Sequence, residues 1–455
     1  MEINDLDSYK KQLFAKQPLK KLRIGILCNW FPYPIRSGSN SRLADLLKHL
    51  QHVGHHVHLV VIDQPYWWRK YLARGNVAET SFILSPGKNF VSFLARSTYW
   101  FFVDLVWFIF SVDLDAFFVK KRNMLGDASA SKADYWNLAS PGLSNRINNI
   151  AIRHGWQVVI VEYVWLHHLV DALPDNIMRI LDSHDVMHLR HLRLTKLGLH
   201  SPFPIHEQEE ADLLAKFHCV IAIQHSERQL FFRLRDQSGH SYDIITVGIS
   251  YDEIPCADDC VLTTGDKKHV VLFVGGMNPF NVEGIRGFIR NQWLELHRLN
   301  NQWDLHVYGG VCGGIEAQPE NGVRLFGVVD TIEPYYRIAD IVINPVWSGT
   351  GLKIKTIEAL AHALPLVTTP SGVEGMPGEI NDACMVARDQ SDFFNMLSNL
   401  MQSVSLRSRL SAAALAYRKS FLCPDNVYSQ LDVYLSKIDE HINRPQCVQR
   451  SFKMR

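Results

Sequence analysis

Short apolar runs alternate with longer amphipathic segments along most of the chain. In the first half the runs that predict strands are 24–28, 57–62, 158–161, 178–181, 219–223 and 244–247. A second series follows at 270–274, 305–308, 323–326, 341–344 and 366–368. Strands that alternate with helical patterns are typical of parallel sheets covered by helices on both faces. We therefore expect an α/β protein built from two doubly wound domains.

Breaks in this pattern indicate where the domains begin and end. A polar, Lys-rich segment opens the chain and predicts a loose arm, whereas a stretch with Pro, Gly and several Asp after residue 250 predicts a linker. A last helical pattern follows a break at Pro424. The expected parts are an arm at 1–20, a first domain at 21–250, a linker at 251–268, a second domain at 269–422 and a C-terminal helix within 423–455.

Composition narrows the class of protein. With 455 residues, 47% of them hydrophobic and 20% charged, the chain is long enough for two full cores and resembles a soluble globular protein. Lys and Arg number 47 against 46 Asp and Glu, so no global basic field favours nucleic-acid binding. The eight Cys are scattered and indicate reduced thiols, and the polar start indicates no signal peptide. These features predict a cytoplasmic protein.

Residues 90–112 are unusually apolar and aromatic. Arg96 and Asp104 interrupt the run, which argues against a transmembrane helix. Trp100 and Trp107 suit an interfacial position. We therefore expect peripheral contact with the inner face of a membrane or with a lipid-linked molecule, and a helix buried in the first domain is the alternative.

The stretch 339–376 predicts a strand, a turn, a helix and a second strand in direct succession. Apolar runs at 341–344 and 366–369 enclose a Gly-rich turn at 348–351 and a helical pattern that starts near Leu352. Such a unit belongs to a parallel sheet. Its turn lies at a helix N-terminus, where free backbone N–H groups and the helix dipole attract anions.

The side chains around this turn extend the hypothesis. Gly349 and Gly351 would let the backbone approach a ligand closely, and Lys353 and Lys355 add positive charge. Glu358 lies beside the apolar stripe that is expected to face the sheet, which consists of Ile354, Ile357, Ala361 and Leu364. A partly buried carboxylate requires hydroxyl or N–H partners. Together these features predict a nucleotide-diphosphate site, with an ordinary tight turn as the alternative.

The run GTGLKIKTIEALAHALPLVTT, followed by GVEGM, resembles the donor-site segment of GT4-type retaining glycosyltransferases with the GT-B fold. It is most similar to the branch whose motif reads G-x-G-x-[RK]-x-K-x-x-E-A. The segments 272–284, 22–61 and LDSHDV at 181–186 are also similar, so the resemblance frames most of 22–420. It implies two Rossmann-like domains that face each other across a cleft, with a terminal helix that crosses back onto the first domain.

The resemblance also implies an activity. A hexosyltransferase of the EC 2.4 type would move a sugar from a nucleotide-diphosphate sugar, with retention, to a glycan, lipid-linked or other hydroxyl acceptor, as in polysaccharide or glycoconjugate biosynthesis. The implied donor-binding residues are Gly38, Gly275, Gly276, Gly349, Thr350, Gly351, Leu352, Lys353, Lys355 and Glu358. His184, Lys355 and Glu358 are the expected catalytic residues. No Asp-x-Asp motif lies in a suitable loop, so we expect neither a metal nor a cofactor.

The first domain supplies further candidates, each with a structural alternative. Arg42, Tyr163 and Trp165 are candidates for the acceptor side, although the two aromatic residues also suit a core. Gly38 could instead belong to a helix cap made by Ser37 or Ser39. His184 could be a structural histidine.

A zinc site is a weaker hypothesis. His184, His188 and His191 share a helical face if one helix holds all three, but HDVMH lacks the Glu of a zinc-protease motif.

Two departures from the family pattern bear on the function. Thr350 stands where the common site has a carboxylate, and the loop after residue 274 has no Arg or Lys before Arg286. Phosphate binding would therefore depend more on Lys353 and Lys355. The alternatives are a non-catalytic nucleotide-sugar-binding protein and a sugar-nucleotide epimerase on the same fold.

Overall fold

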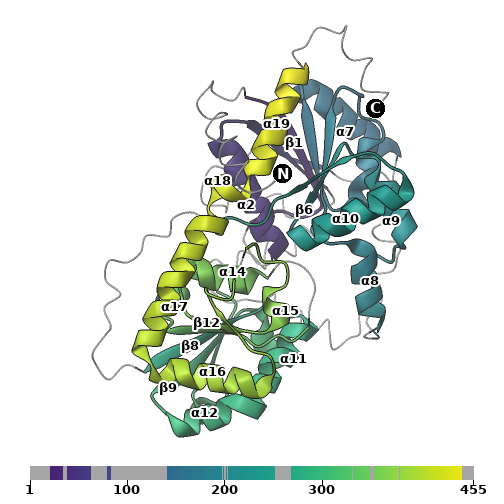
Figure 1. Cartoon of the computed structure of the whole chain (residues 1–455). Helices are drawn as coiled ribbons and strands as arrows, with labels where there is room; N and C mark the ends of the chain where they lie inside the picture. The colour runs from purple at the N-terminus through teal and green to yellow at the C-terminus, as the bar shows by residue number, and fades with distance from the viewer. Residues whose placement is uncertain are drawn as a thin grey trace.

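The computed structural model shows two α/β domains, each built around a parallel sheet (Figure 1). The structure describes residues 21–33, 38–62, 79–83, 141–196, 198, 201, 203–251, 268–329, 331–348, 353–378 and 380–442. The predicted arm 1–20, the aromatic segment 90–112 and most of the predicted linker therefore lie outside the described residues, as does the turn 349–352.

The first sheet has seven parallel strands within the described residues, in the order β3-β2-β1-β4-β5-β6-β7. They are β1 (Arg23–Cys28), β2 (His56–Ile62), β3 (Glu79–Ile83), β4 (Val158–Glu162), β5 (Met178–Asp182), β6 (Cys219–Ala222) and β7 (Asp243–Thr246). Six of these strands were predicted, because strands buried on both faces read as continuous apolar runs. The edge strand β3 was missed because its sequence, ETSFI, is mixed and only Ile83 is buried.

The second sheet has six parallel strands within the described residues, in the order β10-β9-β8-β11-β12-β13. They are β8 (His269–Val274), β9 (Trp303–Tyr308), β10 (Val323–Gly327), β11 (Ile341–Asn344), β12 (Leu366–Thr368) and β13 (Met385–Val386). Helices α11 (Pro279–Phe288), α12 (Leu294–Leu299), α13 (Glu333–Arg337), α14 (Ile354–Ala361), α15 (Pro370–Val373), α16 (Gln390–Gln402) and α17 (Val404–Tyr417) surround it. Short helical turns complete the domain at η2 (Ile289–Trp293), η3 (Gly310–Gly314), η4 (Pro319–Asn321) and η5 (Arg418–Leu422).

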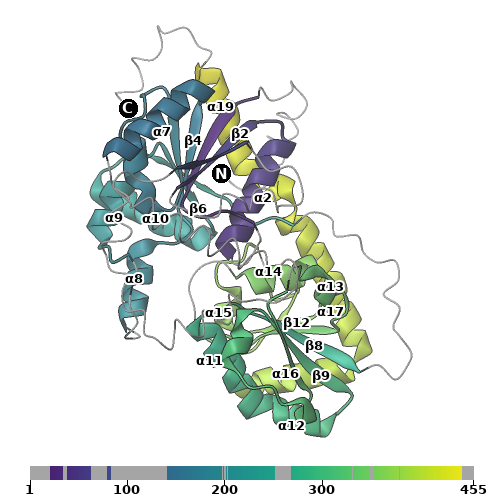
Figure 2. The same ribbon diagram turned by 180° about the vertical axis from the view of Figure 1, so that it is seen from behind.

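The last helices return to the first domain, as the resemblance implied. Helix α18 (Pro424–Val427) leads into α19 (Ser429–Ile442), which lies along the first domain in both ribbon views (Figures 1 and 2). Leu431 and Leu435 are buried in the same apolar cluster as β1 and α2 (Gly38–His52). Nε2 of His49 lies 2.9 Å from a carboxylate oxygen of Asp432, and the His49 ring stacks on Tyr428. The helix is thus part of the first domain's core.

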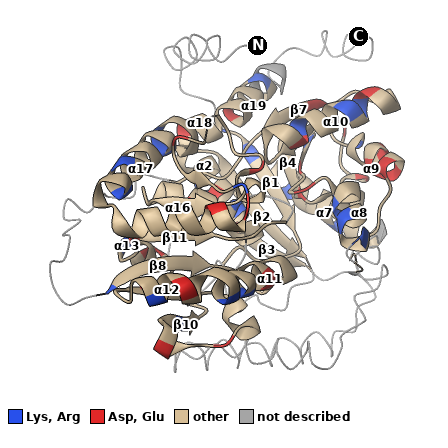
Figure 3. Ribbon diagram, turned by 60° about the horizontal axis from the view of Figure 1, so that its bottom comes forward, with Lys and Arg blue, Asp and Glu red and all other residues tan. Residues whose placement is uncertain are grey.

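The other helices of the first domain are α7 (Pro141–His154), η1 (Val164–Val170), α8 (Met187–Lys196), α9 (Glu207–Leu214) and α10 (His225–Ser238). Acidic residues gather in the first turn of α9, and Arg193 and Lys196 lie in the last turn of α8 (Figure 3). Within the described residues, no helix has the length and apolar character that a membrane crossing needs.

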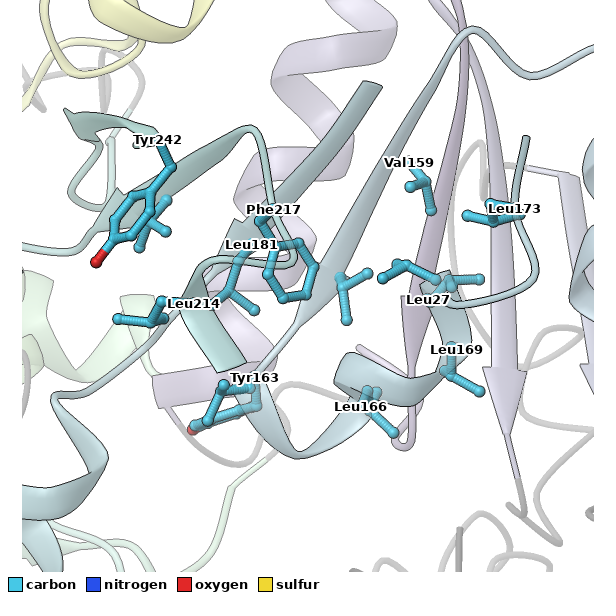
Figure 4. Close-up of a cluster of buried hydrophobic side chains, with 14 of the residues drawn as sticks. Leu27, Val159, Tyr163, Leu166, Leu169, Leu173, Leu181, Leu214, Phe217 and Tyr242 are labelled. Carbon is cyan, nitrogen blue, oxygen red and sulfur yellow. The ribbon is translucent and has the colours of Figure 1, made fainter. Parts of the chain in front are cut away.

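Apolar clusters fill both faces of the first sheet. One cluster packs Leu166 and Leu169 of η1 and Leu214 of α9 under the strand residues Leu27 and Leu181 (Figure 4). The other lies between the sheet and helices α2 and α19. These clusters fix the strands, so the residues that follow the strand ends have defined positions.

The two domains meet at the carboxyl ends of their strands. Gly38 follows β1, and a Cβ added to it would lie 3.1 Å from Cγ1 of Ile354, the first residue of α14. Gln224 follows β6, and its side chain touches Gly375, which follows α15. Ligands of open parallel sheets bind beyond the carboxyl ends of strands. The junction therefore lies where such a ligand is expected.

Candidate active site between the two sheets

The N-terminus of α14 is the centre of the site. The helix begins at Ile354 with Lys353 as its N-cap, two residues later than predicted, and ends at Ala361, so Leu364 lies beyond it rather than on its apolar stripe. The Thr356 hydroxyl donates to the Gly372 carbonyl at 2.7 Å. The first N–H groups of a helix have no acceptor within it. The helix end is thus anchored, and within its first turn the N–H groups of Thr356 and Ile357 donate to the Lys353 carbonyl at 2.9 and 3.0 Å.

Lys355 lies beside the loop that follows β8. Its Nζ donates to Oδ1 of Asn281 at 2.8 Å, and Nδ2 of Asn281 donates to the Gly276 carbonyl at 3.0 Å. Burial lowers the pKa of Lys355 to about 8, with Glu358 opposing this shift and Lys353 adding to it. The structure thus brings Lys355 together with Gly275 and Gly276, as the sequence predicted.

The glycines of this loop permit a close approach between two loops. A Cβ on Gly309, which has a φ of 94°, would lie 2.3 Å from the carbonyl oxygen of Gly275. A Cβ on Gly276 would meet nothing within 4 Å. Position 309 therefore needs glycine for packing, whereas Gly276 faces open space beside Lys355 and Asn281.

Lys353 extends from the start of α14 toward the first domain. Its Nζ lies 3.7 Å from a carboxylate oxygen of Glu374, and the lysine side chain is only 9% exposed. Burial lowers its pKa, while the charges of Glu374 and, across the junction, Asp185 oppose that shift. Glu374 also lies 3.8 Å from Arg193 of α8. Lys353 is therefore a cation at the boundary between the domains.

Glu358 is held by two tyrosines. Tyr336 donates its hydroxyl to Oε2 of Glu358 at 2.8 Å, and Tyr251 also hydrogen-bonds to this carboxylate. Burial raises the pKa of Glu358, and the bond from Tyr336 opposes that shift. Tyr251 bonds Ser41 of α2 as well. The predicted hydroxyl acceptor thus already accepts hydroxyl groups, and these come from the protein.

Gly38 and its neighbours supply the first domain's side of the junction. Gly38 is the first residue of α2 and contacts Ile354 across the domain boundary. Ser39 lies inside the helix and does not form its cap, whereas Ser37, the other cap candidate, lies outside the described residues. Its hydroxyl lies 2.8 Å from that of Tyr163. The remaining donor candidates, Gly349 to Leu352, lie outside the described residues.

Arg42 was expected in the cleft, and this prediction is wrong. The side chain is buried and forms a two-pronged ion pair with Asp182, with Nε 2.8 Å from Oδ2 and Nη2 2.8 Å from Oδ1. Its Nη1 donates to the carbonyl of Val247 at 2.8 Å. These donors are occupied within the first domain, so Arg42 holds β5 and β7 together.

The imidazole of His184 forms a buried hydrogen bond with a carboxylate. Its Nε2 lies 2.6 Å from Oε2 of Glu162, the last residue of β4. Burial and the charge of Asp182 raise the pKa of Glu162, while the bond to His184 opposes them. The histidine is thus satisfied by a side chain, not by the backbone as the structural alternative supposed.

Tyr163 has an aromatic ring stacked on each face, and the half-buried Trp165 is one of these two partners. Their rings stack on each other with centroids 3.9 Å apart, and Tyr163 stacks on His184 at 4.0 Å. Tyr163 is buried. Their acceptor-side role is therefore not supported, and the alternative of packed aromatics fits their positions.

The three-histidine face does not form. His184 has a φ of 59° and lies before α8, whereas His188 and His191 are inside that helix. Nδ1 of His188 lies 2.6 Å from Oε2 of Glu210. The three histidines therefore do not share one helical face, and the zinc hypothesis that depended on such a face is wrong.

Another set, Glu162, Asp182 and His184, comes close enough to hold a metal ion, with ligand atoms within 4.8 Å. Both Asp182 oxygens already accept bonds from Arg42. We therefore describe this set as a hydrogen-bonded network.

Several residues of the site were missed by the sequence analysis. Asn281, Tyr336, Tyr251 and Glu162 contact the predicted residues directly. Glu162 had a usable signal, because it ends a strand next to the strand that precedes His184. The two tyrosines had no such signal, because no local sequence pattern shows that a distant tyrosine hydroxyl donates to Glu358.

Comparison with known proteins agrees with this geometry. Residues 268–403 match the family model described as "Glycosyl transferases group 1". This segment of the chain is therefore similar to that family. The matched segment contains β8, Asn281, Lys355 and Glu358, so the candidate donor site lies within the glycosyl transferases group 1 segment.

Solved structures of glycosyltransferases share the GT-B fold over most of the chain. Sucrose-phosphate synthase from Thermosynechococcus elongatus is similar at a TM-score of 0.59 and 12% identity, covering 93% of this chain and 99% of that one. HepE of Anabaena, in complex with UDP and glucose, reaches 0.60 at 11% identity, covering 91% and 99%. WaaG, a glycosyltransferase involved in lipopolysaccharide biosynthesis, reaches 0.53 at 13% identity, covering 90% and 99%.

A curated relative is similar over a shorter stretch. It is an "Uncharacterized 44.6 kDa protein in cps region" of Klebsiella pneumoniae, 23% identical over 172 residues. The match covers 35% of this chain and 44% of the relative, which is less than half of its length.

Proposed function

We propose that the protein is a glycosyltransferase that moves a sugar from a nucleotide-diphosphate sugar to a hydroxyl acceptor, with retention at the anomeric carbon. The observation that carries this proposal is the placement of Lys355 and Glu358 one turn apart at the start of α14, beside Gly276 and opposite Gly38. A cation and free N–H groups suit a diphosphate, and the carboxylate suits a ribose.

The departure of the nucleoside diphosphate is the step that these residues would assist. Negative charge develops on the leaving phosphate, and fixed cations in a partly buried site stabilise it without reorganising. Lys355 and Lys353 would supply those cations, and the N–H groups at the start of α14 would add to them. We propose that this arrangement replaces a metal ion.

Glu358 would bind the ribose by exchange. In the ligand-free protein its carboxylate accepts from Tyr336 and Tyr251. Ribose hydroxyls are donors of the same kind, so they could take the place of one tyrosine without leaving the buried carboxylate unpaired.

The donor and acceptor classes follow from similar proteins and from sequence. HepE was solved with UDP and glucose, which supports a UDP-hexose as the first donor to test. WaaG is involved in lipopolysaccharide biosynthesis, which supports a glycan or lipid-linked acceptor. We propose that the enzyme acts in the cytoplasm, with residues 90–112 contacting the inner face of a membrane.

A donor-binding screen followed by two substitutions tests the proposal. Among UDP-, GDP-, ADP- and CMP-sugars, one donor at 100 times its dissociation constant should stabilise the protein by about 2.7 kcal/mol. Lys355→Ala and Glu358→Ala should each lower transfer by 100-fold or more, roughly 3 kcal/mol of barrier. Transfer is measured as free nucleoside diphosphate released with acceptor present.

Matched substitutions control for charge removal alone. Lys268→Ala and Glu295→Ala remove a lysine and a glutamate from the same domain, in pairs with Asp304 and Arg298. Both should leave transfer unchanged. Wild-type turnover in a folded Lys355→Ala, Glu358→Ala double variant would refute the proposed site. Tight donor binding without transfer to any acceptor would favour the non-catalytic binding protein.

A further inference from the structure

Two buried histidine–carboxylate pairs in the first domain have the same length but different surroundings. His184 with Glu162 and His188 with Glu210 both have nitrogen–oxygen distances of 2.6 Å. Glu210 also accepts the backbone N–H groups of Met187 and His188 at 2.8 and 2.7 Å, so it caps α8. Oε1 of Glu162 has no hydrogen-bond partner in the described part of the chain. Helix capping therefore accounts for a buried carboxylate at position 210, whereas no such structural role accounts for the one at position 162.

The position of Glu162 is costly for the folded protein. It is fully buried at the end of β4, directly opposite Asp182 in the register of β4 and β5. Arg42 compensates Asp182 with two hydrogen bonds, whereas His184 is the hydrogen-bond partner of Glu162. Replacing both members of a buried pair such as Glu162 and His184 by apolar side chains is often neutral or stabilising. The carboxylate is thus better explained by what it does to His184 than by stability.

The His184 ring is held on several sides. Tyr163 stacks on it with centroids 4.0 Å apart and planes 10° apart, and Trp30 meets it edge-on at 5.7 Å. Tyr163 and His184 have φ values of 68° and 59°, two of the three positive values among described non-glycine residues. Strained backbone of this kind clusters at functional sites.

The held ring lies at the junction with the second domain. Its stacking partner Tyr163 touches Ser39, whose neighbour Gly38 contacts Ile354 at the start of α14. The residue after His184 is Asp185, whose charge acts on Lys353 across the boundary. The ring is therefore close to both sides of the candidate donor site.

We propose that Glu162 is a positioning residue that fixes the orientation and the proton of His184. In its ionised form Glu162 accepts this bond, which would place the imidazole proton on Nε2. Nδ1 is then the nitrogen that remains to accept a hydroxyl proton from a sugar. This inference rests on the proposed function, because the sugar hydroxyl belongs to the donor or the acceptor of that reaction.

The decisive variant replaces the carboxylate by an apolar side chain of similar length. Glu162→Met should lower kcat by about 10- to 100-fold, the loss expected when a reacting geometry is displaced by about 1 Å. The KM for the donor should change by less than about threefold, because Lys355 and Glu358 still hold the nucleotide. Glu162→Gln should recover much of the loss, since its amide oxygen can accept the same N–H.

Glu210→Met is the matched control, since it breaks the other 2.6 Å histidine–carboxylate pair. It should lower the melting temperature but leave the kcat of the folded protein within about twofold, because Glu210 caps a helix. Equal losses of kcat in both variants would overturn the positioning role, since any broken buried pair would then suffice.

A spectroscopic readout separates positioning from general damage. In protein labelled with ¹⁵N-histidine, the His184 ring, assigned with His184→Gln, should carry its proton on Nε2 in the wild type. In Glu162→Met it should show a mixture of tautomers. If Glu162→Met changes neither the tautomer of His184 nor kcat, the positioning role is overturned. The proposed function would still stand in that case, because the wild type transfers the sugar. A wild type that neither binds nor transfers any sugar nucleotide would instead defeat the proposed function itself.

Discussion

Charged side chains at the carboxyl ends of the two sheets have different kinds of partners. In the first domain the charged side chains pair with one another, as Arg42 does with Asp182, His184 with Glu162 and Arg190 with Asp185. In the second domain Lys355 is held by the neutral amide of Asn281. Lys353 forms an ion pair with Glu374, whose side chain is 46% exposed. These three pairs of the first domain are closed by charged partners, whereas Lys355 donates to a neutral amide and lies near the buried carboxylate of Glu358.

This difference indicates which side binds the anion. Burial lowers the pKa of Lys355 although the charge of Glu358 opposes that shift, so this buried cation gains when an anion arrives. A site that is already neutralised gains little. The comparison therefore supports the proposal that the diphosphate binds to the second domain and that neutral groups, such as sugar hydroxyls, bind to the first.

Breaking the internal pairing of the first domain should give the largest effect. Arg42→Met leaves Asp182 buried without its cation, and loss of one partner of a buried pair costs about 3–5 kcal/mol. The matched change in the second domain, Arg324→Met, removes a half-exposed arginine from Asp304 and should cost less than about 1 kcal/mol. Urea unfolding followed by fluorescence gives both values. Equal losses would show that the two domains do not differ in this respect.

A smaller effect should follow from deprotonating Lys355. Its pKa is lowered to about 8, so the charged form is lost as the pH rises through that value. Affinity for the nucleoside diphosphate should fall about 10-fold between pH 7 and pH 9, since a bond to a charged group contributes roughly 1.5–3 kcal/mol. Calorimetric titration measures this. Lys355→Arg, if folded, should show no such decrease.

The protonation of Lys355 should also affect the stability of the folded protein. A lysine whose pKa is lower in the folded state binds fewer protons there, so its contribution to stability rises with pH between about 8 and its usual value of 10.5. Binding should therefore weaken over the pH range in which this contribution to stability begins to increase. A wild-type affinity that stays flat to pH 9 would argue that Lys355 does not contact the phosphates.

The smallest expected effect is that of metal removal. If Lys353, Lys355 and the start of α14 supply the positive charge, EDTA should leave the rate of transfer unchanged. The measurement is turnover before and after dialysis against EDTA. Loss of activity that Mn²⁺ or Mg²⁺ restores would mean that the cations of the second domain are not sufficient.

The sequence predicted strands best where burial was complete. All five residues of β4 are buried, and its run VVIVE stands out against the helical segments around it. Strand β13 was missed because it has two residues, both only partly buried. Edge elements of this kind form because a neighbour offers hydrogen bonds, and their own sequences carry little signal.

The candidate site was predictable only where its residues are close in sequence. Lys355 and Glu358 were identified because one helix turn carries both. Asn281 lies 74 residues from Lys355, and Asp182 lies 140 residues from Arg42. No local pattern reports such pairings, so Arg42 was taken for a cleft residue although its charge was already matched inside the fold.

The return of α19 has a consequence for synthesis on the ribosome. Tyr428, Leu431 and Leu435 complete one of the two apolar clusters of the first domain, yet they emerge after the entire second domain has been translated. Until then one face of the first sheet lacks part of its cover, and exposed apolar surface of this kind attracts chaperones or other nascent chains. The first domain to be translated is therefore the last to be finished.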